Sequence, residues 1–215
     1  MPDFAFFLQA AVSVFAVVDP LAAAVLFGVM TAGDSHLARR RMARRAALMT
    51  AGVLSWFLLF GGLLFALFSI TTSAFRIAGG LVIGIMALDM LKATHTGVRA
   101  TAEEQTDGIA KEDVSITPIA VPLLAGPGAI STVMILASRD GLAGYAMVLS
   151  AIVLVSLASW LLLREASRVV DVLGHTGINV IGRLMGLIVL AVAVQFVVDG
   201  VLELVPAVRA ILEAA

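Results

Sequence analysis

The chain contains 215 residues, of which 61% are hydrophobic and 13% are charged, and its mean hydropathy is +1.08. Soluble domains carry about 25% charged residues, so this composition excludes an ordinary soluble domain. The net charge of −1 gives no indication of nucleic-acid binding, and we expect none. The chain has no cysteine, which excludes disulfides and thiolate metal sites.

Apolar stretches recur along the whole chain. A helix needs about 20 apolar residues to cross the hydrocarbon core, and these stretches are long enough. They are too uniformly apolar for the alternating strands of a membrane β-barrel. The first stretch has no basic start, so we interpret it as a retained helix and not a cleaved signal. We therefore expect an all-α integral membrane protein with six transmembrane helices, at about residues 4–31, 46–68, 74–91, 114–138, 142–163 and 178–200.

Basic residues predict the orientation of these helices. They gather after the first helix, after the fifth helix, and in a polar segment at 92–113, and the first loop alone holds Arg39, Arg40, Arg41, Arg44 and Arg45. Loops rich in Lys and Arg stay on the cytoplasmic side. We interpret the arginine cluster as a determinant of topology, in preference to a lipid or nucleic-acid site. The segment 92–113 is then a cytoplasmic linker, and both termini face away from the cytoplasm.

The two halves of the chain match at a fixed shift of 107 residues. This shift places Pro20 on Pro127 and Arg76 on Arg183, and both residue types are rare here. Three helices per repeat is an odd number, so the second repeat enters the membrane from the opposite side. This is the inverted-repeat plan of many secondary transporters. The predicted units are 1–91, the linker 92–113, and 114–215.

Proline interrupts the first and fourth predicted helices near their middles. Proline lacks an N–H and clashes with the preceding turn, although it is tolerated at the first position of a helix. Two broken helices would present half-helix N-termini, which favour a carboxylate, to a cavity at the membrane centre. The alternative, in which proline only kinks continuous helices, stays open. The candidate site residues for substrate or ion are Asp19, Pro20, Gly126, Pro127, Gly128 and Ser131.

Acidic side chains are rare within apolar spans. Asp19 stands where an N-cap carboxylate belongs, and it could serve as a cap alone or contact a solute, a proton or a cation. The sequence leaves both interpretations open.

Two charged pairs on the third and sixth helices suggest a gate. Those helices run in opposite directions, which brings Arg76 to the level of Asp199 and Arg183 to the level of Asp89. We expect two cross-repeat ion pairs, Arg76 with Asp199 and Arg183 with Asp89. Alternatively, the four side chains reach the interfaces from their own helix ends.

Catalytic and cofactor motifs are absent from the sequence. The three histidines, His36, His95 and His175, lack metal-ligand spacing, and the chain has no nucleophile elbow and no P-loop. We expect no enzymatic activity, no cofactor and no metal site.

Four stretches resemble the MarC family of bacterial inner-membrane proteins: FAVVDPLAAAVLFGVMT, AFRIAGGLVIGIMALDML, IAVPLLAGPGAISTVMILAS and NVIGRLMGLIVLAVAVQFVVDG. The resemblance covers nearly the whole chain and implies a six-helix carrier in the bacterial plasma membrane, with neutral amino acids as the expected solutes. Members of the family usually show Asn-Pro where this chain has Asp19-Pro20, and a following Gly and Pro are replaced here by alanines.

These observations favour a secondary transporter that works by alternating access around two broken helices. Its expected partners are a small-molecule substrate, membrane lipid, and a proton or sodium ion as the coupling ion. A membrane scaffold or regulatory protein without transport is the alternative. The sequence does not determine the oligomeric state.

Overall fold

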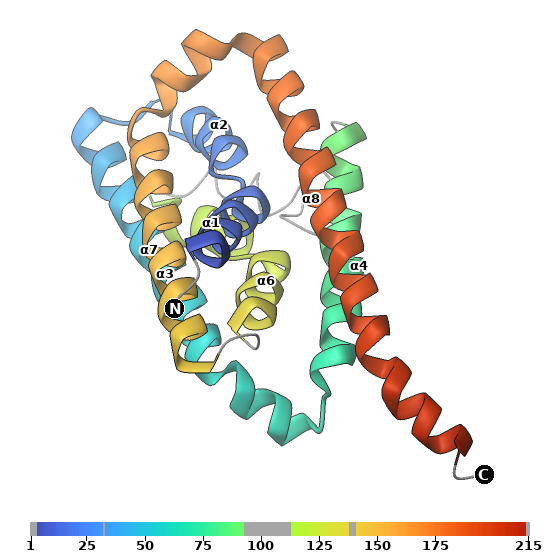
Figure 1. Ribbon diagram of the computed structural model, residues 1–215. Coiled ribbons are helices and arrows are strands. Elements are labelled where there is room, and N and C mark those ends of the chain that lie inside the picture. Colours follow the sequence, from blue (N-terminus) through green and yellow to red (C-terminus); the bar gives the residue numbers. More distant parts are fainter. Residues whose placement is uncertain (1–3, 32, 93–112, 138–140, 214–215) are drawn as a thin grey trace.

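The computed structural model describes residues 4–31, 33–92, 113–137 and 141–213. All regular elements in these ranges are helices, which confirms the all-α expectation. The linker predicted at 92–113 lies almost entirely outside the described residues. Figure 1 shows the elements, which are α1 (Phe4–Val18), α2 (Pro20–Met30), α3 (His36–Phe68), α4 (Thr72–Lys92), the wide helix η1 (Ser115–Leu124), α6 (Pro127–Ala137), α7 (Gly141–Arg164) and α8 (Ala166–Glu213).

Within the described ranges, five stretches are long and apolar enough to cross a membrane: Phe4–Gly28, His36–Phe68, Thr72–Lys92, Gly141–Arg164 and Val180–Val205. The first of these joins α1 and α2. The stretch expected at 114–138 is divided into η1, with 10 residues, and α6, with 11 residues. Each is shorter than the roughly 20 residues that a single spanning helix needs. The protein is thus a multi-pass helical membrane protein.

Two helices are longer than the sequence predicted. α3 begins at His36, so the arginines that were assigned to a loop lie in its first turns. Ser35 caps this helix, because its side chain accepts a hydrogen bond from the backbone N–H of Ala38 at 3.3 Å. Arginine favours helix, so nothing in the segment stops the helix from starting early. α8 continues to Glu213, although the sequence analysis ended the last helix at residue 200 and expected a tail after it. Gly174, with φ of 60°, interrupts the early turns of α8.

The helices form two side walls around a central group. In Figure 1, α3 and α7 lie on one side, α4 and α8 lie on the other, and α1, α2 and α6 lie between them. α4 and α8 have the most extensive contact of any pair of helices among the described residues. This arrangement buries Asp19 and Pro20 at the first interruption and Gly126 and Gly128 at the second, where Pro127 is exposed.

Glycines bring the backbones of α4 and α8 into contact. A Cβ added at Gly80 would lie 2.8 Å from the carbonyl oxygen of Ala193, and a Cβ added at Gly200 would lie 2.9 Å from the carbonyl oxygen of Ser73. Such distances leave no room for any side chain. Small residues at a membrane helix interface allow this close approach, which van der Waals contact then stabilises.

A polar contact connects α3 to the start of η1. Arg45 on α3 donates to Asp113 at 2.5 Å, and the backbone N–H of Ser115 donates to the same carboxylate at 2.9 Å. Partial burial raises the pKa of the Asp113 carboxyl, but the hydrogen bonds from Ser115 and the charge of Arg45 together hold it below its usual value. This contact is therefore present at neutral pH.

The α4–α8 contact can be tested with two glycines of the same helix. We expect Gly80→Ala to destabilise the protein by about 1–3 kcal/mol, because the new methyl group overlaps the backbone of α8. Gly84→Ala is the matched control, since its Cβ would meet only the Cβ of Ala193 at 3.7 Å, an ordinary contact. Thermal unfolding of both variants in detergent measures the difference. Equal melting temperatures would contradict the close backbone contact.

Candidate functional site

Asp19 occupies the junction between α1 and α2. Its φ is 51°, in the left-handed region, which Asp and Asn tolerate better than other residues with side chains. The residue before a proline is disfavoured in the helical conformation, so Pro20 forces this departure from the helix. The Asp19 carboxylate accepts a hydrogen bond from the backbone N–H of Ala22 at 3.3 Å and thereby caps α2. Only 4% of Asp19 is exposed, so its carboxylate lies in the interior.

The junction between η1 and α6 is built differently. η1 has the wider hydrogen-bond spacing, as in the bond from the N–H of Ala125 to the carbonyl of Ala120 at 2.8 Å. Pro127 is the first residue of α6, a position where its missing N–H costs little. The carbonyl of Gly126 accepts from the N–H of Ile130 at 3.0 Å, but Gly126 has no side chain to cap the helix. The first turn of α6 therefore receives no carboxylate from its own N-cap.

The two junctions come together in the interior. A Cβ at Gly128 would lie 3.1 Å from a methyl carbon of Val17, the second-last residue of α1, and α1 contacts α6. The same Cβ would lie 2.7 Å from the sulfur of Met86 and 3.3 Å from Ile83, both on α4. Residues that the sequence separates by more than a hundred positions thus form one buried region. Apolar side chains from α1 and α4 pack around Gly128, which is buried, whereas Pro127 is exposed.

Ser131 connects this region to α4. It lies one turn into α6 and is buried, and its side-chain oxygen would be 3.3 Å from a Cβ at Gly79. Because Gly79 has no side chain, the side of α6 that carries Ser131 can approach α4 closely. The neighbouring Thr132 satisfies its hydroxyl within α6 by donating to the carbonyl of Gly128 at 2.8 Å.

Arg76 is one turn away from Gly79 on α4, and its side chain is only 8% exposed. It forms an ion pair with Glu203 on α8, a residue that the sequence analysis did not select. Glu203 was overlooked because it fell in the segment assigned to a tail beyond the last helix. Its position four residues after Asp199, and so on the same side of a continuing helix, was the signal that could have found it.

The other proposed gate residues occupy the same two helices. Asp199 accepts a hydrogen bond from Gln195 at 2.7 Å, Asp89 is half-buried near the end of α4, and Arg183 is exposed on α8. The pairing of Arg76 with Asp199 and of Arg183 with Asp89 stays a prediction.

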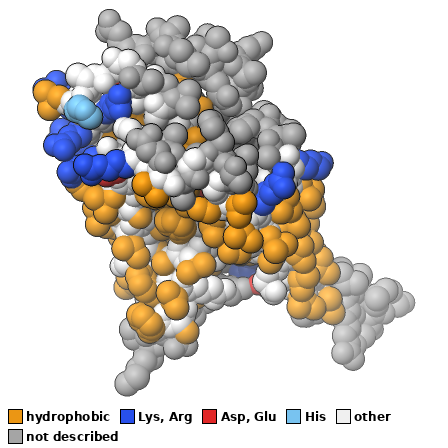
Figure 2. Space-filling model, turned by 90° about the horizontal axis from the view of Figure 1, so that it is seen from above, with side chains coloured by type: hydrophobic (Ala, Val, Ile, Leu, Met, Phe, Trp, Pro, Cys, Tyr) orange, Lys and Arg blue, Asp and Glu red, His pale blue; other side chains and the backbone are white. Residues whose placement is uncertain are grey.

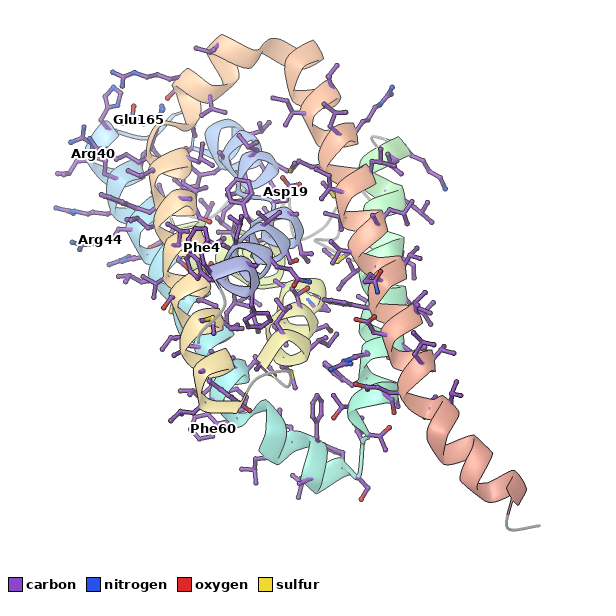
Figure 3. The ribbon with its side chains drawn as sticks, in the orientation of Figure 1. Phe4, Asp19, Arg40, Arg44, Phe60 and Glu165 are labelled. Carbon is purple, nitrogen blue, oxygen red and sulfur yellow. The ribbon has the colours of Figure 1, made fainter. Side chains whose placement is uncertain are left out.

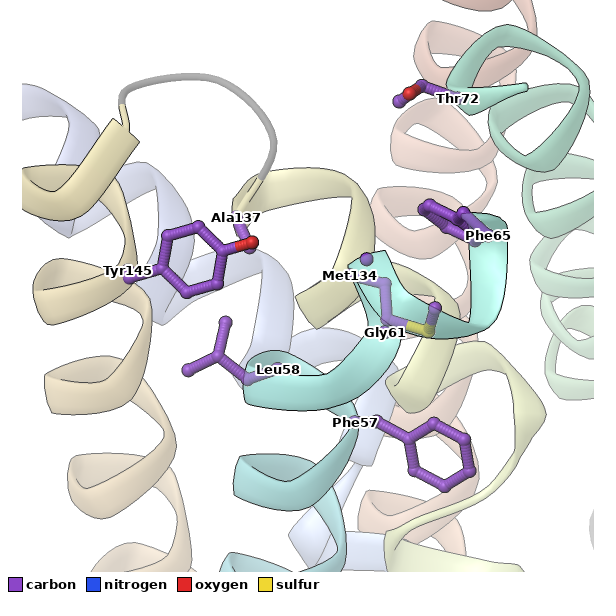
Figure 4. Close-up of a pocket in the computed structure, with 9 residues that line it drawn as sticks. Phe57, Leu58, Gly61, Phe65, Thr72, Met134, Ala137 and Tyr145 are labelled. Carbon is purple, nitrogen blue, oxygen red and sulfur yellow. The ribbon is translucent and has the colours of Figure 1, made fainter. Parts of the chain in front are cut away.

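A cavity of about 280 Å³ opens beside the central group, between α3, α6 and α7 (Figure 4). Figure 4 shows the ring of Tyr145 and the side chain of Leu58 on one side and Met134 and Phe65 on the other. The cavity reaches α6 through Met134 and Ala137, at the opposite end from Gly128. Phenylalanine, leucine, glycine, alanine and methionine make up most of its lining residues, to which Thr72 and Tyr145 add polar groups. In the described part of the chain, no group of His, Asp and Glu residues could hold a metal ion.

Comparison with known proteins identifies the family. The model of the "MarC family integral membrane protein" matches residues 4–205. The UPF0056 membrane protein YvbG of Bacillus subtilis (strain 168) is 37% identical over 205 residues, which cover 94% of this chain and 97% of that protein.

Two further relatives extend the match to other lineages. The UPF0056 membrane protein YhcE of Escherichia coli (strain K12) is 34% identical, with 95% of each chain covered. The UPF0056 membrane protein MJ1677 of Methanocaldococcus jannaschii is 32% identical, over 93% of this chain and 97% of that protein. No solved structure matches the chain. The matches confirm the resemblance noted in the sequence, and the chain belongs to the MarC family of integral membrane proteins.

Proposed function

We propose that the protein is a secondary transporter of a small solute and that the solute is a neutral amino acid. We further propose that the protein works by alternating access around two broken helices. The observation that carries this proposal is the meeting of the Asp19 junction with the Gly126–Gly128 junction inside the protein. Interrupted helices and an intramembrane carboxylate at one place are typical of solute and ion pathways.

The contacts between the two halves support the inverted-repeat part of the proposal. If the halves are related by a two-fold axis in the membrane plane, each contact has a counterpart with the halves exchanged. α4 contacts α6 as α2 contacts α8, α3 contacts η1 as α1 contacts α7, and α3 contacts α6 as α2 contacts α7. The contact of α1 with α8 has no equal counterpart between η1 and α4. α3 with α7 and α4 with α8 are their own counterparts. We infer that 1–91 and 114–215 are the two repeats.

The two junctions suggest opposite roles toward a zwitterion. The carboxylate of Asp19 already occupies the N-terminus of α2, so this end repels a second carboxylate and attracts an ammonium group. Gly126 leaves the N–H groups of Gly128 and Ala129 without a capping side chain, and a helix N-terminus favours negative charge. We propose that the solute carboxylate binds at α6, with Ser131 nearby, and that its ammonium group faces Asp19.

In the arrangement seen here, the first turn of α6 is partly covered, because Gly128 is buried whereas Pro127 is exposed. Val17, Ile83 and Met86 lie around the position that a Cβ of Gly128 would occupy, and we propose that a solute entering beside Gly128 displaces them. Methionine is flexible and adapts its shape readily, so Met86 is suited to such a displacement. We propose that relative motion of α4 and the two broken helices opens this contact.

The arginine-rich end sets the proposed orientation. We place the protein in the bacterial plasma membrane with the start of α3 on the cytoplasmic side and with both termini on the opposite side. A proton or a sodium ion is the proposed coupling ion, and Asp19 is the proposed residue that contacts it.

Uptake into proteoliposomes tests the proposal. We expect the purified protein to accumulate labelled glycine or alanine above the level of protein-free liposomes, under a proton gradient, under a sodium gradient or in counterflow. Counterflow is included because it needs no coupling ion. The absence of flux for every small neutral amino acid under all three conditions would contradict the substrate class.

Substitution of Asp19 separates its charge from its structural role. Asn keeps an oxygen that can cap Ala22 and tolerates a positive φ, so Asp19→Asn should keep the native melting temperature while changing the ion dependence of uptake. Asp19→Ala loses the cap and should cost about 1–2 kcal/mol. Melting in detergent and uptake at several pH values measure both effects. An Asn variant with native ion dependence and native affinity for the solute would reduce Asp19 to a cap.

The gate proposal is tested by double-mutant cycles on α4 and α8. We expect a coupling of about 1 kcal/mol between Arg76→Gln and Glu203→Gln in thermal unfolding, since Glu203 is partly exposed and its charge is screened. A second cycle combines Arg76→Gln with Asp199→Asn and measures the rate of solute uptake. It tests whether these two residues form the proposed gate pair. A coupling near zero between Arg76 and Asp199 would remove that pair from the proposal.

A further inference from the structure

The first turns of α3 extend beyond the hydrocarbon core. α3 has 33 residues, which correspond to about 50 Å of helix, whereas the core is about 30 Å thick. Its apolar part ends at the arginines, which occupy positions 39–45. Their guanidinium groups therefore lie at the level of the lipid phosphates. Figure 2 shows Lys and Arg side chains along the margin of a broad hydrophobic surface.

A second group of arginines adjoins the first at the junction of α7 and α8. Arg39 on α3 donates to the hydroxyl of Ser167 at 3.0 Å, which holds the two segments together. Arg164 and Arg168 flank Glu165, and Arg164 lies 5.7 Å from the ring centre of Trp160. The combined surface, which we call the arginine face, comes from α3, α7 and α8.

Positive charge exceeds negative charge on the arginine face. Residues 33–45, 113 and 164–168 include seven arginines and three acidic residues, Asp34, Asp113 and Glu165. Asp113 is engaged by Arg45 and Glu165 by Arg164 and Arg168. Arg40, Arg41 and Arg44 are exposed and form no ion pair among the described residues. Figure 3 shows Arg40 and Arg44 pointing outward from α3.

An apolar stripe continues from these arginines along the membrane-facing side of α3. Arg41, Arg45, Leu48, Trp56 and Leu59 are all exposed and follow one another at helical spacing. A basic group at the head of an exposed apolar stripe matches a molecule with an anionic head and hydrocarbon chains.

We propose that the arginine face is a binding site for an anionic phospholipid, with the phosphate held by Arg41 and Arg44 and the acyl chains lying along the apolar stripe of α3. Guanidinium groups bind phosphate oxygens in a bidentate manner, and basic clusters at the cytoplasmic end of membrane helices recognise anionic headgroups. The site is separate from the proposed solute site and does not depend on the transport proposal.

Fluorescence quenching by brominated lipid tests the site in the full chain. The chain has two tryptophans, so Trp160→Phe leaves Trp56, which is exposed on the apolar stripe, as the single reporter. The protein is reconstituted into phosphatidylcholine containing a small fraction of brominated phosphatidylglycerol or of brominated phosphatidylcholine. We expect stronger quenching by brominated phosphatidylglycerol. Each arginine near the surface contributes about 1 kcal/mol, so Arg41→Gln or Arg44→Gln should lower the preference roughly fivefold, and both together roughly 30-fold.

Lys92→Gln is the matched control. Lys92 is an exposed cation at the end of α4, on the opposite side wall from α3, and its removal changes the net charge by the same amount. We expect it to leave the preference within about twofold of the starting chain, because surface charges separated by more than a Debye length of about 10 Å are screened. Equal quenching by the two brominated lipids would overturn the proposal. An equal loss in Lys92→Gln and Arg44→Gln would also overturn it, because the attraction would then belong to the general surface charge.

Discussion

The structure depends on one constraint, which is that backbone polar groups inside a membrane need hydrogen-bond partners from the protein itself. Continuous helices meet this condition without help. The junctions at Asp19 and at Gly126 depart from the regular helix, and the protein covers both of them. Asp19 is 4% exposed and supplies its own carboxylate to α2, while Gly126 is buried and Gly128 packs against α1 and α4. The two side walls of helices make these departures possible.

Close packing of α4 against α8 also stabilises the structure. The glycines that allow the two backbones to touch also bring Arg76 next to α8, where Glu203 neutralises its charge. A charged side chain at 8% exposure would be costly without such a partner. The ion pair and the glycine contacts therefore stabilise the same interface by different means, one through charge and the other through van der Waals contact.

The sequence predicted features whose cause is local. The cap at Asp19, the start of α6 at Pro127 and the all-α class follow from the chemistry of a few neighbouring residues, and the structure has all three. The sequence analysis did not predict that the arginines at 39–45 are helical. Their charge indicates on which side of the membrane the segment stays, but not which backbone conformation it adopts. Nor did the sequence predict Glu203 as the partner of Arg76. In uniformly apolar helices, periodicity does not show which face is buried, so the α4–α8 interface emerges only from the assembled fold.

The left-handed backbone at position 19 restricts which residues can occupy it. Glycine would fit the backbone but provide no oxygen for Ala22, and longer or branched side chains would be strained at a φ of 51°. Aspartate and asparagine meet both demands and have nearly the same shape. Sequence divergence at this position can therefore exchange an acid for an amide while the surrounding helices stay in place, which makes it a point where family members can differ in electrostatics without differing in architecture.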